Sequence, residues 1–357
     1  MMQKISTLRN RFFVFAPLLL ACLGWQACTS PASQPLVLIA ESQQQWTGIS
    51  INKQTDALYV CYPYWADSMT MHVGELLGSS TQPWPDARWN SWRLGDSIRP
   101  DQFVCVQSVV ADDSGRLWVV DPMNPFFKGV LGGGGRVHLF DAERKQHLRT
   151  YTIPIGVIGP NSYLNDIRIS RTGDYAYLTD SGEGGIVVLN LATGQSKRML
   201  HGHRTTQASR RSFTANGHTF SNVVHSDGIA LDQTTQTLYY MPLMSDSLYA
   251  ILAPALIYSR SDAGLETAMK TIGRTGPADG LWIDSTGQVI VSALEQNAIL
   301  KISPTGQLRT LVQDSTRLLW PDSFTENKRG ELFFTTAQIH LPPAQRGPYR
   351  IYKLRKL

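Results

Sequence analysis

The chain has 357 residues, of which 42% are hydrophobic and 17% are charged, with a formal net charge of +5. This apolar content excludes an intrinsically disordered chain, because such chains are poor in hydrophobic residues and rich in charge. Residues 1–28 contribute three basic and no acidic side chains, so the remainder carries 30 basic against 28 acidic residues. A nearly neutral chain without a basic stripe gives no reason to expect a nucleic-acid partner.

The first 28 residues have the pattern of a targeting segment. A basic start precedes an apolar run over residues 12–20, which is too short to cross a bilayer as a mature helix. Cys28, or alternatively Cys22, ends a stretch that resembles the cleavage box of bacterial lipoproteins, and residues 29–35 would form a tether. An ordinary secretory signal is the other interpretation. We expect an exported protein, either a cell-envelope lipoprotein that touches the membrane only through its lipid or a secreted protein.

After residue 35 the chain repeats one pattern six times: a polar residue, a short apolar run, a polar turn and a second apolar run. The six leading polar residues are Thr47, Gln107, Asn165, Asp227, Asp279 and Asp322, with spacings of 60, 58, 62, 52 and 43 residues. Repeats of this length with about four short strands each predict an all-β, six-bladed β-propeller. No unit can bury both faces of its own sheet, so residues 36–357 are predicted to form one domain.

Two strands outside this pattern predict how the ring closes. Residues 36–41 form a continuous apolar run before the first unit, and residues 349–354 alternate between apolar and polar side chains. A ring of blades must leave no sheet edge exposed. We therefore expect the N-terminal strand to complete the last blade beside residues 349–354.

Two cysteines remain after the targeting segment. Cys61 ends the second strand of the first unit, and Cys105 enters the first strand of the second unit. Neighbouring blades could bring them together, and export permits a disulfide. The alternative is two buried free thiols that pack as small apolar groups. Their spacing has no metal-site signature.

The connection over residues 200–226 is longer than the others. Long connections in compact folds are commonly lids or mobile excursions, and we favour a lid over one channel mouth. It contains His201, His203, His218 and His225. Histidine-rich tracts can bind metal, but these histidines lack the spacing of a known site.

Equivalent positions in a ring of repeats lie at equal heights around its axis, so the six leading residues should meet at one channel mouth. Trp46 and Trp320 adjoin two of them and could form an aromatic wall, whereas Trp282 is expected to pack between blades. Three carboxylates and an amide could hold a hard cation such as Ca²⁺ or receive a cationic organic ligand such as an amine. Alternatively, an Asp before Gly can simply cap a turn by accepting backbone N–H bonds.

Several stretches resemble signatures of the Yellow and major royal jelly protein family. They are residues 106–121, 165–167, 177–181, 226–231 and 319–323, within a resemblance that covers about residues 45–340. The resemblance implies a six-bladed propeller. Some insect members bind small aromatic amines in the central channel, and others are associated with pigment chemistry. The expected function is therefore binding of a small organic ligand in the channel of a monomeric protein.

A more distant resemblance is to the gluconolactonase and senescence-marker family, which is also six-bladed. Those enzymes hold a divalent cation with a first-blade glutamate and later Asn and Asp residues. Asn165, Asp227 and Asp279 match the later positions, but Thr47 replaces the glutamate. One alternative is thus a lactonase-like hydrolase that depends on Ca²⁺ or another divalent metal, and another is a protein-interaction scaffold. The sequence identifies no catalytic residue and no required cofactor.

Overall fold

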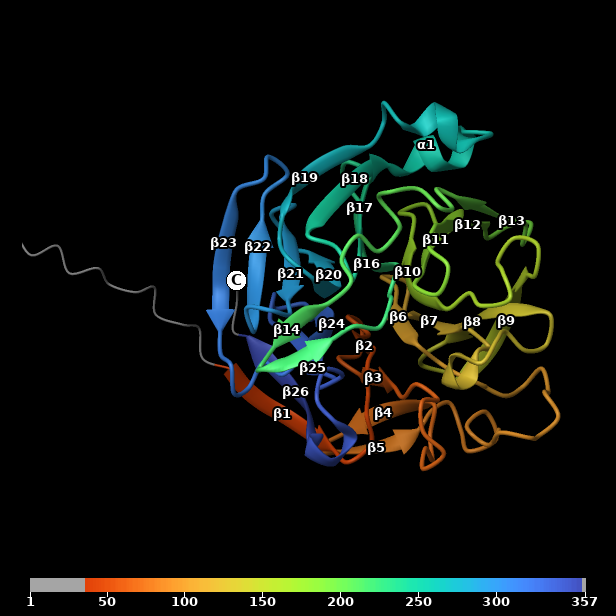
Figure 1. Ribbon diagram of the computed structural model, residues 1–357. Helices are drawn as coiled ribbons and strands as arrows, with labels where there is room; N and C mark the ends of the chain where they lie inside the picture. The colour runs from red at the N-terminus through yellow and green to blue at the C-terminus, as the bar shows by residue number, and fades with distance from the viewer. Residues whose placement is uncertain (1–35, 355–357) are drawn as a thin grey trace, which may run out of the picture. The chain divides into compact units, whose positions relative to one another are not determined.

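The computed structural model describes residues 36–354, so the predicted targeting segment and tether lie outside the described part of the chain. Six four-stranded antiparallel sheets surround a common axis (Figure 1). This arrangement confirms the predicted six-bladed β-propeller. Each blade has its first strand nearest the axis, and the chain then moves outward through the sheet before it crosses to the next blade.

The first five blades each use four consecutive strands. Blade 1 contains β2 (Ile49–Ile51), β3 (Leu58–Cys61), β4 (Val73–Leu77) and β5 (Ser80–Pro83). Blade 2 contains β6 (Ser108–Ala111), β7 (Arg116–Asp121), β8 (Gly134–Asp141) and β9 (Gln146–Pro154). Blade 3 contains β10 (Leu164–Ile169), β11 (Tyr175–Asp180), β12 (Ile186–Asn190) and β13 (Ser196–Met199). Blade 4 contains β16 (Ser226–Asp232), β17 (Thr237–Pro242), β18 (Ser247–Leu252) and β19 (Lys270–Arg274). Blade 5 contains β20 (Ala278–Ile283), β21 (Val289–Ala293), β22 (Ala298–Ile302) and β23 (Leu308–Gln313).

Blade 6 joins the two ends of the described chain. It is built from β24 (Pro321–Glu326), β25 (Leu332–Thr336), β26 (Tyr349–Leu354) and β1 (Leu36–Ser42). In Figure 1 the red β1 lies beside the blue β26, and the two strands pair antiparallel with Leu36 opposite Leu354. The predicted closure by the N-terminal strand is confirmed.

A few short elements lie outside the blades. The connection between blades 3 and 4 contains a hairpin of β14 (Phe213–Ala215) and β15 (His218–Phe220). Blade 4 carries the helix α1 (Ala253–Tyr258) between its two outer strands. Within residues 36–354, no helix has the length and apolar character needed to cross a membrane.

Apolar side chains fill the spaces between neighbouring blades, because each sheet has a neighbour on both faces. Cys61 and Cys105 are part of this core as buried free thiols, so the structure corrects the disulfide alternative. The Cys61 thiol donates a hydrogen bond to the carbonyl oxygen of Gln107 over 3.0 Å. Burial raises the pKa of both thiols to about 12, so neither is a reactive thiolate at neutral pH.

Candidate functional site

The six leading residues lie at the same end of the inner strands. Thr47 and Gln107 come just before β2 and β6, and the other four are the second residues of β10, β16, β20 and β24. Hydrogen bonds join neighbours: Thr47 Oγ1 donates to the Gln107 carbonyl over 3.1 Å, and Asn165 Nδ2 donates to Asp227 Oδ2 over 2.9 Å. We call Thr47, Gln107, Asn165, Asp227, Asp279 and Asp322 the polar ring. The structure brings these residues together, whereas ligand binding by them stays a prediction.

A β-bulge places the polar-ring residue in each of blades 3 to 6. In blade 4, Ser226 is opposite Pro242 but Ile229 is opposite Tyr240, so two inner residues face one residue of β17. The same shift occurs at residues 165–166, 279–280 and 322–323. Bulges bend a strand locally and re-aim its side chains, and they are enriched beside functional sites. The sequence repeats therefore encode a repeated local distortion at this channel mouth.

In blades 4 and 5, steric contact with the next blade explains why the residue after the aspartate is glycine. A Cβ atom on Gly228 would overlap the carbonyl oxygen of Asp279, and one on Gly280 would overlap the carbonyl oxygen of Asp322. Neighbouring blades thus approach each other closely at the polar ring. The repeated Asp-Gly pair reflects this contact between blades.

The three ring carboxyls do not cap turns. None of them accepts a hydrogen bond from a backbone N–H within residues 36–354, whereas the buried Asp121 accepts three. Their donors are side chains: Asn165 Nδ2 for Asp227, Trp320 Nε1 for Asp279 and Ser323 Oγ for Asp322, at 2.9, 2.7 and 3.0 Å. The structural explanation that the sequence left open therefore does not account for these aspartates.

All three carboxyls are buried, and their pKa values are raised. Burial, followed by the charges of Asp279 and Asp322, holds the pKa of Asp227 well above its usual range. Burial also raises the pKa of Asp322 strongly, and the neighbouring Asp279 adds to this. Burial raises the pKa of Asp279 to about 6, although hydrogen bonds from Trp320 and Asp227 oppose the shift. Clustered, dehydrated carboxyls favour the protonated form in this way.

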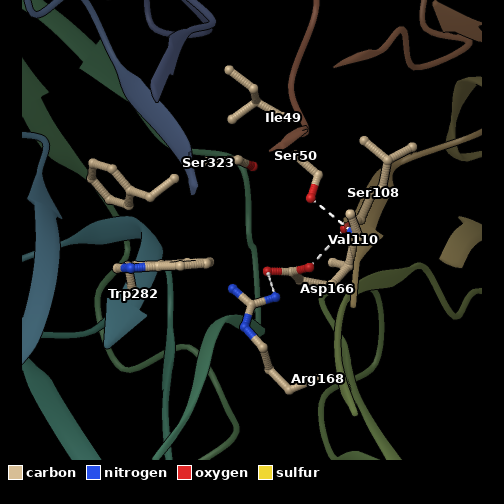
Figure 2. Close-up of a pocket in the computed structure, with 11 residues that line it drawn as sticks. Ile49, Ser50, Ser108, Val110, Asp166, Arg168, Trp282 and Ser323 are labelled. Atoms are coloured by element: carbon tan, nitrogen blue, oxygen red, sulfur yellow. Dashed lines mark hydrogen bonds and ion pairs between the residues drawn. The ribbon is translucent and has the colours of Figure 1, made fainter. Parts of the chain in front are cut away.

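A fourth carboxyl beside the ring was missed by the sequence interpretation. Asp166 follows Asn165, at the position where the other blades have Gly or Ser. It accepts a hydrogen bond from Ser108 Oγ and pairs with Arg168, both over 2.7 Å (Figure 2). Arg168 also donates to the carbonyl oxygen of Leu281 over 3.1 Å and so spans from β10 to β20. In an alignment of the six repeats, Asp166 and Arg168 are exceptions, because the equivalent residues of the other blades are small or apolar.

Two hollows of different volume lie along the channel beyond the polar ring. A cavity of about 30 Å³, room for one or two waters, is lined by Asp166, Arg168, Trp282 and residues of blades 1, 2 and 6. The turns at the far end enclose a wider hollow of about 860 Å³. Figure 2 shows the Trp282 ring beside the Arg168 guanidinium. Trp282 therefore lines the channel and also packs against the hydrophobic cluster between blades 5 and 6, as expected from the sequence.

The two tryptophans predicted beside the ring have different surroundings. Trp320 contacts the ring through Asp279, and its φ of 63° is unusual for a bulky residue. Such backbone strain persists only where the surrounding structure enforces it, and it clusters at functional sites. Trp46 is buried in the hydrophobic cluster of the first blade and packs against Tyr62. Of the two tryptophans, Trp320 is the one whose side chain donates to a polar-ring residue, and the Tyr163 hydroxyl makes a similar contact by donating to Gln107 Oε1 over 3.0 Å.

The β14–β15 hairpin covers the polar-ring end of blades 4 to 6. Phe213 and Phe220 pack against Trp320, with ring centroids 5.7 and 4.9 Å away. Asn216 at the hairpin turn donates to the carbonyl oxygen of Ser315 over 2.7 Å. In Figure 1 the green hairpin lies in front of β24 and β25. This is the placement expected for a lid, and its movement stays a prediction.

The match to a known family is decided by sequence. The profile described as "Major royal jelly protein" matches residues 104–346. The chain belongs to the major royal jelly protein family. Similar proteins include Protein yellow of Drosophila yakuba, 25% identical over 54% of this chain and 39% of that protein, and Major royal jelly protein 7 of Apis mellifera, 24% identical over 51% and 41%. The chain spans less than half the length of these relatives.

Solved structures of proteins other than these relatives have the same propeller fold as this major royal jelly family member. A gluconolactonase from Xanthomonas campestris superposes with a TM-score of 0.55 at 14% identity, over 90% of this chain and 89% of that one. A luciferin-regenerating enzyme gives a TM-score of 0.56 at 14% identity, over 91% and 96%. These identities support a shared propeller fold and carry no activity across.

The polar ring of this family member does not fit the divalent-metal site that the gluconolactonase resemblance implied. Ca²⁺ requires six to eight oxygen ligands. Here the Thr47 hydroxyl donates to a carbonyl, Asn165 turns its amide NH₂ toward Asp227, and one Asp279 oxygen already accepts from Trp320. Among the described residues, no group of three or more His, Cys, Asp or Glu side chains has metal-site geometry, and this includes the histidines of residues 200–226.

Proposed function

We propose that this protein binds a small organic cation in its central channel, with the carboxyls of Asp227, Asp279 and Asp322 as the counter-charge. The observation that carries this proposal is a group of three buried carboxyls without backbone caps. The nearby Arg168 is paired with Asp166, so it does not neutralise the ring directly. A bound cation would supply the missing positive charge.

The energetic argument supports a functional role. Burying like-charged groups together costs stability unless each is neutralised or paired. Burying three aspartates at equivalent positions of successive blades lowers stability, and the turns at these positions do not need a carboxyl group. Trp320 directs its indole N–H at Asp279, while its ring packs against His340, Phe213 and Phe220 and so holds that carboxyl in place. The carboxyl groups favour a positively charged organic group such as an amine or a quaternary ammonium.

Choline tests the proposal, with its neutral carbon isostere 3,3-dimethylbutan-1-ol as the matched ligand. Choline should raise the thermal unfolding midpoint, by about 2.7 kcal/mol of stability at a hundredfold excess over its dissociation constant. The neutral isostere should have little effect. Replacing Asp227 and Asp279 together by Asn should abolish the choline response, whereas Asp113→Asn, on an exposed turn at the other end of the channel, should keep it.

Other outcomes would favour the alternatives. Equal responses to choline and its isostere would contradict a charge-based site. A midpoint that rises with Ca²⁺ in metal-stripped protein would support the lactonase-like hydrolase. Indifference to all three compounds would favour a protein-interaction scaffold.

We also propose that the protein is exported as a lipoprotein through Cys28. The support is the sequence of residues 1–28, where a basic start and an apolar run precede the cysteine. Metabolic labelling with a palmitate analogue should mark the wild-type chain and Cys22→Ser but not Cys28→Ser. Label lost only in Cys22→Ser would move the anchor to Cys22, and an unlabelled wild type would favour a cleaved secretory signal.

A further inference from the structure

We propose that the wide hollow of about 860 Å³ at the far end of the channel is a second binding site, which takes a small organic carboxylate with an apolar body. The turns between the first and second strands of the blades surround this hollow, whereas the polar ring lies at the opposite end of the inner strands. The inference therefore goes beyond the proposed function and does not rest on it. A cavity of this volume is in the range of pockets that hold small organic molecules.

Two large side chains lie at the boundary between this hollow and the rest of the channel. Three residues after the polar-ring position, four blades have the smaller side chains of Ser50, Val110, Ala230 and Thr325. Blades 3 and 5 have Arg168 and Trp282 there instead, and both residues line the wide hollow as well as the small cavity of about 30 Å³. Figure 2 shows the Arg168 guanidinium between Asp166 and Trp282. Arg168 and Trp282 thus form the floor of the wide hollow.

The Arg168 guanidinium has hydrogen-bond donors left for a ligand. Its acceptors in the protein are the carbonyl oxygens of Ile167 and Leu281, at 2.7 and 3.1 Å, and Asp166 Oδ2 at 2.7 Å. A guanidinium has five N–H donors, so the Nε–H and one Nη2–H have no acceptor within residues 36–354. The side chain is 13% exposed and lines the wide hollow. A carboxylate that enters from the turn end can accept these charge-assisted hydrogen bonds.

The carboxylates that line the wide hollow already have partners, with one exception. Three of them accept hydrogen bonds from backbone N–H groups of their own turns, namely Asp112, Asp232 and Asp284. Asp112 also pairs with Arg116, and Asp284 pairs with Lys301. The exception among the lining residues is Asp113, on an exposed turn. The wide hollow therefore offers little negative charge to a cation.

Two cationic side chains at the rim of the hollow are unpaired. Lys53 and Arg171 line the hollow, and neither forms an ion pair within the described part of the chain. Together with the free donors of Arg168, they outweigh the single exposed carboxylate of Asp113. The charge that remains unpaired in the hollow is thus positive, which selects an anionic ligand.

The inner wall of the hollow is apolar. The ends of the first strands contribute Ile51, Ile169, Leu231 and Ile283, whereas exposed polar turn residues form the rim. A concave apolar wall with a few convergent polar groups is the usual construction of a small-molecule pocket. The carboxylate of the ligand therefore meets Arg168, while an apolar ring fills the space between the strand ends.

Titration calorimetry with 2-naphthoate tests the site, with 2-naphthamide as the matched neutral ligand. The two molecules have the same apolar ring, and only the carboxylate carries a charge. The amide should bind at least about tenfold more weakly, because hydrogen bonds between charged groups are stronger than those to a neutral one. This comparison uses the wild-type protein alone, so it does not depend on whether a variant folds. Equal affinities, or no binding of 2-naphthoate, would overturn the proposal.

Variants test whether the ligand lies in the wide hollow. Arg168→Gln should weaken 2-naphthoate binding about tenfold or more. Arg171→Glu reverses a charge on the exposed rim, so the fold should tolerate it, and it should weaken binding about threefold. Arg260→Glu is the matched control, because Arg260 is also exposed but lies after α1 on blade 4, and it should leave the affinity unchanged. Binding that Arg171→Glu weakens no more than Arg260→Glu does would overturn the assignment to this hollow.

Discussion

At the scale of single residues, the glycine after Asp279 sets how closely blades 5 and 6 approach. Gly280→Ala should lower the free energy of unfolding by about 3 kcal/mol, because the added Cβ overlaps the backbone oxygen of Asp322. Gly264→Ala is the matched control, since its Cβ would meet only the Ser259 hydroxyl at 3.8 Å. Denaturant unfolding checks both, and equal stabilities would contradict the close contact between blades.

The repeated residue pattern predicted which residues form the polar ring, but it did not predict whether their side chains cap turns or face the channel. The leading polar residues were visible because each begins an apolar run. Asp166 and Arg168 were missed because they lie one and three residues beyond the repeated position on the same strand, where the repeats share no residue type. Whether an aspartate caps a turn or faces a channel depends on the bulge, which is a property of strand pairing and cannot be seen in one strand.

At the scale of elements, β1 is the strand whose removal should matter most. Without residues 36–42, β26 would lose its outer neighbour, and the buried side chains of Leu36 and Ala40 would be lost. We expect a chain that begins at residue 43 to lose about 3 kcal/mol or more of stability, whereas one that begins at residue 36 should match the parent. Thermal unfolding of the two truncated chains checks this, and equal midpoints would show that closure contributes little.

The position of the β14–β15 hairpin could not be predicted from the sequence of the connection alone. The length of the 200–226 connection indicated a lid, yet strands of three residues are too short to show an alternating pattern. Their position became clear only from the contacts of Phe213 and Phe220 with Trp320. The third strands of blades 3 and 5, β12 and β22, were by contrast predictable because glycine-containing turns follow their apolar runs.

At the scale of the whole molecule, six similar blades produce an unequal ring. Blades 2 and 3 contribute the amides Gln107 and Asn165, while blades 4 to 6 contribute carboxyls, so the carboxyl groups gather on one side of the channel. The hairpin covers that same side. The number of blades and the closure followed from the repeats, because a repeated pattern constrains a ring strongly. The burial of the carboxyls did not, since it depends on contacts between a connection and distant blades.

The pairing of β1 with β26 also determines when the propeller can close during protein synthesis. A ribosome makes β1 about 300 residues before its partner β26, an interval on the order of tens of seconds at typical elongation rates. Throughout that interval β1 has an apolar sequence and no native partner. Completion of the ring must therefore wait until β26 has been made, and until then β1 stays an apolar segment without its partner.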